Sequence, residues 1–227
     1  MQQPTQNQTH PSTGLLARLR SFCPARPLTL AEAKVVAERQ ANALLDWFAV
    51  TEAPTPFDML DGMRRVQVVF ETTPASGSTH WTNGAWLIAL REDDAPARQR
   101  FSLFHELKHV IDHPMRSYLY PPERNWSTER KVERVAEYFA ACVLMPKQLV
   151  KRHYFRGIQD VDTLAELFEV SPLAMDHRLI DDLRMIDPPR FTYACRSRQE
   201  DSRSLPFVLR DRRRPVRQPE STTGGRT

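Results

Sequence analysis

Residues 105–109 read His-Glu-Leu-Lys-His and lie inside a segment with helical periodicity. Asp94 and Pro96 are typical of a helix start and Pro114 of a helix end, so we expect a helix from about residue 95 to residue 112. Residues four apart in a helix lie one turn apart on the same face. Both histidines can therefore reach one metal ion, and Glu106 lies beside that ion, where it can take a proton from a metal-bound water.

Two neutral histidines do not complete a zinc site, because a catalytic zinc ion takes three protein ligands and keeps a fourth position for water. The next expected helix runs from about residue 128 to residue 145, after Ser127 and before Pro146. It carries Glu129, Glu133 and Glu137, each one turn apart, and spacing alone allows any of them to be the third ligand. The other reading of these carboxylates is a solvated face paired with neighbouring basic side chains.

The remaining segments predict a mainly helical α+β domain. Thr29 and Glu32 have capping-box spacing ahead of an apolar-periodic helix from Leu30 to about Phe48. Short apolar strands are expected at 66–70 and 85–90, on either side of a turn-rich stretch. So few strands fit a small antiparallel sheet packed on helices rather than a barrel or sandwich. Further elements are expected as short helices near 147–155, 161–168 and 172–185, and as a late strand at 191–195.

Charge along the chain separates a body from a tail. The 227 residues have a net charge of +4, but residues 196–227 hold nine Arg and four acids, so residues 1–195 sum to −1. A global basic face for nucleic acid is therefore not supported. We predict a flexible N-terminal segment at 1–28, one folded domain at 29–195 and a disordered basic tail at 196–227. Within the N-terminal segment, Leu15, Leu16, Leu19 and Phe22 form a short possible helix.

Several other classes of protein are excluded by composition. The three cysteines are odd in number and far apart, which argues against a disulfide scaffold and fits a reducing cytoplasm. None of the seven glycines forms a nucleotide-binding motif. No apolar run is long enough to span a bilayer, and the N-terminus lacks a signal-peptide pattern, so no membrane association is expected.

Three stretches around the motif resemble the ImmA/IrrE family of metallo-endopeptidases. They are Arg-Phe-Ser-Leu-Phe-His-Glu-Leu-Lys-His at 100–109, Glu-Arg-Val-Ala-Glu-Tyr-Phe-Ala-Ala at 133–141, and Leu-Met-Pro at 144–146. In that family an Arg-Phe-[Thr/Ser]-Leu segment leads into the H-E-x-x-H helix, and a second helix with E-x-x-A-x-x-F-A ends in Leu-Met-Pro. The resemblance covers about residues 30–185.

This resemblance implies a zincin-like fold that holds one zinc ion per chain. Its ligands would be His105, His109 and Glu133, and Glu106 would be the catalytic base. Glu137 stands where the family often has Asn, which leaves it as an alternative ligand or a neighbour of the ligands. Lys108 stands where Gly is common, and we expect it to point outward, away from the metal.

Weaker candidates surround this site. His113 lies one further turn along from His109, and its angular drift favours a neighbouring or surface position over a ligand role. Tyr118, Tyr120 and Tyr138 are candidate donors to the oxyanion of a tetrahedral intermediate, and the alternative is that all three are packing aromatics.

The resemblance also implies a substrate. Family members cut, or are thought to cut, a helix-turn-helix repressor encoded nearby, which releases genes of a mobile element or a stress response. The partner would then be one specific protein rather than bulk peptide, with no direct role for nucleic acid.

A competing signal lies at residues 163–183, which resemble a helix-turn-helix. They favour a different function, a DNA-binding or protein-binding transcriptional regulator with a non-catalytic metal site. Against DNA binding, Glu169 sits where the turn usually has Gly. Only His177 and Arg178 are basic near the groove-facing start, and the helix also carries acids, which repel phosphate, at Asp176, Asp181 and Asp182.

Overall fold

A computed structural model describes residues 14–61, 63–123 and 126–186. Every described residue belongs to one compact unit. The expected strand at 191–195 and the expected tail at 196–227 lie outside the described residues. The predicted α+β class, mainly helical with a small sheet, is confirmed.

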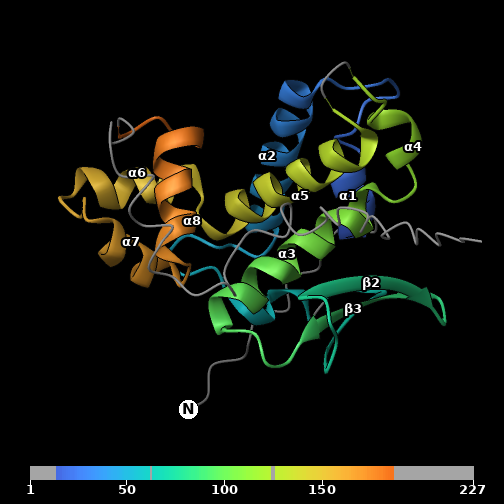
Figure 1. The fold of residues 1–227 in the computed structure, drawn as a ribbon, viewed down its shortest axis with the longest axis horizontal. Helices are drawn as coiled ribbons and strands as arrows, with labels where there is room; N and C mark the ends of the chain where they lie inside the picture. Colours follow the sequence, from blue (N-terminus) through green and yellow to red (C-terminus); the bar gives the residue numbers. More distant parts are fainter. Residues whose placement is uncertain (1–13, 62, 124–125, 187–227) are drawn as a thin grey trace, which may run out of the picture. The chain divides into compact units, whose positions relative to one another are not determined.

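Three long helices form the centre of this unit: α2 (Leu30–Trp47), α3 (Pro96–Asp112) and α5 (Thr128–Leu144). Helix α5 contacts both of the other two (Figure 1). Helix α2 begins with the predicted capping box, in which the Glu32 backbone N–H donates to the Thr29 hydroxyl and the Thr29 backbone N–H donates to the Glu32 carboxylate. The side chains buried in this core include Ala37, Leu44, Leu103, Phe104, Leu107, Val135 and Phe139.

The start of α3 differs from the prediction. Its N-cap is Ala95, with no side-chain hydrogen bond, and Pro96 is the first helical residue. Asp94 therefore does not cap the helix. Proline supplies the start instead, because it lacks the N–H that a cap would otherwise satisfy and its φ is already helical.

The sheet lies against α3 (Figure 1). It contains β1 (Val66–Glu71), β2 (Gly77–Thr82) and β3 (Ala85–Arg91) in the order β1-β3-β2. Strand β3 is central, antiparallel to β2 and parallel to β1. The sheet is therefore mixed, and the expectation of purely antiparallel pairing is wrong for β1. In sequence, β2 lies between β1 and β3. In the sheet, β2 lies at one edge, and β1 pairs directly with β3 and runs parallel to it.

Strand β2 falls within the stretch expected to be turns. It is joined to β3 by Asn83 and Gly84, which have φ of 50° and 77°. Two consecutive positive φ values are typical of the type I′ turn that best suits a two-residue hairpin. An Asn-Gly pair beside an apolar strand is thus the local sequence signal for this strand.

The N-terminal segment is structured from Gly14 onward, against the expectation that residues 1–28 are flexible. Helix α1 (Leu15–Arg20) buries Leu15 and Leu19 in the core. The Arg20 guanidinium donates to the carbonyl oxygens of Val110 and Ile111 at 2.9 and 3.1 Å. These carbonyls lie in the last turn of α3, where no intrahelical donor is available. The segment therefore closes the C-terminal end of α3.

The C-terminal part of the described chain is a group of short helices. These are α6 (Lys147–Phe155), α7 (Val161–Phe168) and α8 (Pro172–His177), with the π-helical turn η2 (Arg178–Asp182) continuing α8. The 3₁₀ turn η1 (Phe57–Leu60) and the short helix α4 (Arg116–Leu119) complete the unit. In the described residues, no helix combines the length and apolar character needed to cross a membrane.

Candidate metal centre

One face of the C-terminal half of α3 is less buried than its other faces. His105, Glu106 and His109 are partly exposed, whereas the residues between and after them are buried. The two imidazoles lie one turn apart, with their Nε2 atoms 3.0 Å from each other. Each ring thus turns the same nitrogen toward a common point, as the helical spacing predicts.

Helix α5 supplies the carboxylate at this point. Glu133 places Oε2 3.2 Å from His105 Nε2 and Oε1 3.5 Å from His109 Nε2. These three side chains form the group of His, Cys, Asp and Glu donors within the described residues that converges closely enough for a metal ion. Of the three glutamates that spacing allowed, Glu133 is the one that α5 brings to the histidines.

The separations within this group fit a zinc ion. Ligand atoms at about 2.0–2.2 Å from zinc in a tetrahedral arrangement lie about 3.3 Å from one another. The observed distances of 3.0, 3.2 and 3.5 Å bracket this value. Two imidazoles and one carboxylate are also a donor set that zinc binds in hydrolytic enzymes.

Protonation in the group favours metal ligation. Burial, followed by the neighbouring His105, lowers the pKa of His109 to about 4, so this ring is neutral near pH 7. Burial would raise the pKa of Glu133, but the hydrogen bond with His105 and the nearby charges hold it below its ordinary value. A neutral imidazole and an ionised carboxylate are the forms that bind a metal.

The Glu106 side chain lies against the sheet. It contacts Gly77 of β2, and the absence of a side chain on that glycine leaves it room: an ideal Cβ on Gly77 would lie 2.9 Å from Glu106 Cγ. Burial raises the pKa of Glu106, and a hydrogen bond with the Thr79 side chain is among the contacts that lower it. A carboxylate with a raised pKa beside a set of possible metal ligands is suited to exchange protons near neutral pH.

Lys108 does not point outward as expected. It is 1% exposed, and its Nζ donates to Gln40 Oε1 at 2.7 Å and to Asp112 Oδ1 at 2.6 Å. Since Gln40 belongs to α2, the side of α3 that carries Lys108 is covered by another helix. A position directed away from the metal is therefore a core position in the molecule. The charge is accommodated because a carboxylate and an amide both accept from it.

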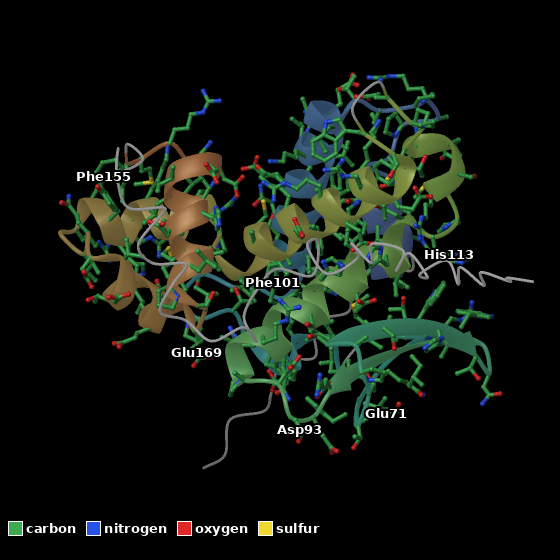
Figure 2. The ribbon with its side chains drawn as sticks, viewed as in Figure 1. Glu71, Asp93, Phe101, His113, Phe155 and Glu169 are labelled. Carbon is green, nitrogen blue, oxygen red and sulfur yellow. The ribbon has the colours of Figure 1, made fainter. Side chains whose placement is uncertain are left out.

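The other predicted residues lie outside the converging group. Glu137 pairs with Arg134 at 3.1 Å. His113, at the C-terminal end of α3 (Figure 2), packs its ring against Trp86 with centroids 4.7 Å apart. Neither is among the converging metal-type donors.

The three tyrosines have different surroundings. Tyr120 is buried, and its hydroxyl donates to Asp112 Oδ2, so it is committed to the core. Tyr138 packs against the cations of Lys34 and Arg178. Tyr118 on α4 is exposed and stays the one candidate of the three whose ring is open to solvent.

The helix-turn-helix pattern does form a helix pair, but its basic side chains are occupied. Arg178 is 1% exposed and donates to the Met145 carbonyl oxygen at 3.1 Å. His177 pairs with Asp181 at 2.9 Å. Of the two basic residues expected near the groove, one is therefore in the core and the other is paired with an acid, which is unfavourable for phosphate contacts.

Glu169 has a packing role in the turn of this helix pair. It has φ 52° and ψ 47°, the left-handed conformation usually taken by Gly. Its carboxylate, beside the N-terminal part of α3 (Figure 2), pairs with Arg100 Nη1 at 3.1 Å. The ion pair joins the helix pair to the helix that carries the histidines, so this turn serves internal packing.

Gly77 and Thr79 were not identified from the sequence as neighbours of the site. Both lie in the strand that was expected to be turns. The Asn-Gly turn is a signal for the strand, but nothing in the sequence indicates that the start of the strand contacts Glu106.

The fold and the converging His-His-Glu group define a class of protein: an α+β domain with side chains that could hold a metal ion between two helices. A model of the IrrE N-terminal-like domain, a peptidase family, matches residues 65–180, just over half of the chain. The chain belongs to this family, as the motifs at 100–146 predicted. The matched range contains the sheet, both helices of the centre and most of the helix pair.

A solved structure supports the fold at greater distance. A Mycobacterium tuberculosis transcriptional regulator is similar with a TM-score of 0.51 and 19% sequence identity, over 78% of this chain and 53% of that one. The chain thus spans about half the length of that regulator, and the similarity concerns the fold. A search of curated proteins finds no match to this chain.

Proposed function

We propose that this protein is a zinc-dependent endopeptidase that cleaves a specific protein substrate. The observation that carries the proposal is the convergence of His105, His109 and Glu133 beside the partly buried carboxylate of Glu106. The family assignment supports the same activity. One zinc ion per chain would be held by the two Nε2 atoms and the Glu133 carboxylate.

When bound there, zinc supplies a Lewis acid for the peptide carbonyl and makes a water molecule nucleophilic near neutral pH. Glu106 accepts a proton from that water as its oxygen adds to the carbonyl carbon. It then donates the proton to the amine as the C–N bond breaks. Its raised pKa suits both transfers, because the carboxyl must gain and lose a proton in one cycle.

The substrate would bind as an extended segment beside β2. This strand is at the edge of the sheet and hydrogen-bonds to β3 on one side only among the described strands. A free edge can accept an added strand through main-chain hydrogen bonds. Its first residues lie against Glu106, so a peptide along this edge passes close to the proposed base.

A helix-turn-helix repressor encoded beside the gene is the proposed substrate. This assignment comes from the resemblance to the ImmA/IrrE family. The alternative, a DNA-binding regulator that uses residues 163–183, is disfavoured because Arg178 is buried and His177 is paired.

The test incubates the zinc-loaded protein with the purified neighbouring repressor and follows cleavage by mass spectrometry. Wild type is expected to cut it at a defined bond. Glu106→Gln is expected to keep zinc and lose cleavage by at least about 100-fold, since the general base is absent. His105→Ala is expected to lose both. Full activity of the Gln variant would remove Glu106 from the mechanism.

A further inference from the structure

We propose that Gly77 and Thr79 of the edge strand are positioning residues that fix the orientation of the Glu106 side chain. This inference rests on the proposed function for its chemical meaning. The contact itself is a property of the structure and can be tested separately.

The register of the hairpin puts both residues on one face. Gly77 is opposite Leu90 and Thr79 is opposite Ile88. Residues directly opposite each other in an antiparallel pair project from the same face of the sheet. Because Leu90 and Ile88 are fully buried, Gly77 and Thr79 face the interior, where α3 lies, rather than solvent.

Glycine is required at position 77 by Glu106 and not by the backbone. The backbone there has no left-handed φ, so an L-residue could adopt it without strain. The three heavy atoms nearest an added Cβ all belong to Glu106: Cγ at 2.9 Å, Oε1 at 3.2 Å and Cδ at 3.4 Å. A Cβ would therefore displace the middle of the Glu106 side chain as well as its carboxylate end.

Thr79 holds the other end of the same side chain. Two residues along the strand and on the same face, its side chain lies close enough to the Glu106 carboxylate to lower the pKa of Glu106. Gly77 thus leaves the space and Thr79 supplies the anchor. Because the sheet holds Glu106 while α5 carries Glu133, the two carboxylates are positioned by different elements, and this keeps them in separate roles.

A stability cycle tests the contact without any substrate. In the full chain, Gly77→Ala is expected to lower Tm by about 5 °C, because the added Cβ overpacks the site. In a Glu106→Ala background, which lacks the Cγ, the same change is expected to shift Tm by less than about 1 °C. Ser78→Ala, at the neighbouring position on the other face, is the matched control and should behave alike in both backgrounds.

An equal loss of Tm in both backgrounds would overturn the role assigned to Gly77. If Gly77→Ala does not fold, Thr79 provides the second measurement. Thr79→Val removes the hydroxyl at nearly constant shape and is expected to lower kcat on the repressor about 10-fold, with KM and bound zinc unchanged. Thr79→Ser keeps the hydroxyl and should restore most of kcat.

Loss of the peptidase activity and loss of the Glu106 contacts give different experimental results. If wild type cleaves no repressor, the proposed function fails, while the stability cycle still reports whether Gly77 and Glu106 are coupled. If cleavage occurs but Thr79→Val and Thr79→Ser have equal kcat, the enzyme stands and the anchoring role of Thr79 is overturned.

Discussion

At the scale of single residues, the two histidines could be assigned from spacing, but Glu133 could not. The sequence leaves Glu129, Glu133 and Glu137 equivalent, because all three repeat at one turn of a helix. The choice depends on how α5 crosses α3, which is a tertiary property. Only the family resemblance favoured Glu133 in advance, and the geometry brings the same residue to the histidines.

Glu137 provides a discriminating substitution on the same helix. Its carboxylate pairs with Arg134, and it lies outside the converging group. Glu137→Ala is therefore expected to keep zinc at the wild-type level and to change stability by less than about 0.5 kcal/mol, as for an ordinary surface pair. Metal analysis of the purified variant checks this, and loss of zinc would make Glu137 a ligand.

The surroundings of Lys108 do not follow from helical periodicity. Its side chain is directed away from the His-His-Glu group but enters the core, where Asp112 and Gln40 accept hydrogen bonds from its ammonium group. Periodicity identifies the face of a helix, but it does not reveal that a second layer of helices covers that face.

We expect Asp112→Ala to lower the free energy of unfolding by about 3–5 kcal/mol, because it leaves the Lys108 charge buried without its carboxylate. Denaturant titration measures the loss. Lys147→Ala, an exposed lysine at the start of α6, serves as control and should stay within about 0.5 kcal/mol of wild type. A loss of similar size in both variants would argue against a buried ion pair.

At the scale of elements, helix boundaries with chemical signals were predictable. Thr29 with Glu32 and Ser127 mark the starts of α2 and α5 as expected. The edge strand β2 was not predicted because polar residues dominate it. A strand that pairs on one side only and is partly exposed lacks the continuous apolar run by which a buried strand is recognised in a sequence.

The capping box of α2 makes a contribution to folding stability that depends on pH. Hydrogen bonds, first from the Arg26 side chain and then from the Thr29 backbone and side chain, lower the pKa of Glu32 from 4.5 to about 2. A depressed pKa in the folded state means that the stabilisation is present above pH 4.5 and is lost as the pH falls toward 2. Glu32→Gln should therefore have a lower Tm than wild type at about pH 6, and the difference should narrow below the ordinary pKa of the carboxyl. A difference that is constant from about pH 6 to about pH 3 would contradict this.

At the scale of the whole molecule, the folded body begins earlier than the sequence suggested. The leucines of the short helix α1 have helical spacing, but the residues around the helix are polar and rich in proline, which is typical of a flexible segment. Leu19 is fully buried and its carbonyl accepts from Gln40 at 2.9 Å. The matched family range starts at residue 65, so α1 and α2 extend the core beyond it.

We expect Leu19→Ala to cost about 2–5 kcal/mol in the free energy of unfolding, as for a leucine deleted from a packed core. Chemical denaturation of the full chain measures it. The control is Leu173→Ala, whose side chain is 44% exposed and should contribute little. If the two variants were equally stable, α1 would not belong to the cooperative core.

The central claim is that His105, His109 and Glu133 form one metal site. Its most direct test is zinc per chain, measured on wild type and Glu133→Ala purified without added zinc. We expect about one zinc in wild type and loss of most of it in the variant, because two histidines alone hold zinc weakly. A wild-type protein that carries no zinc and cannot take it up would contradict the claim despite the geometry of the site.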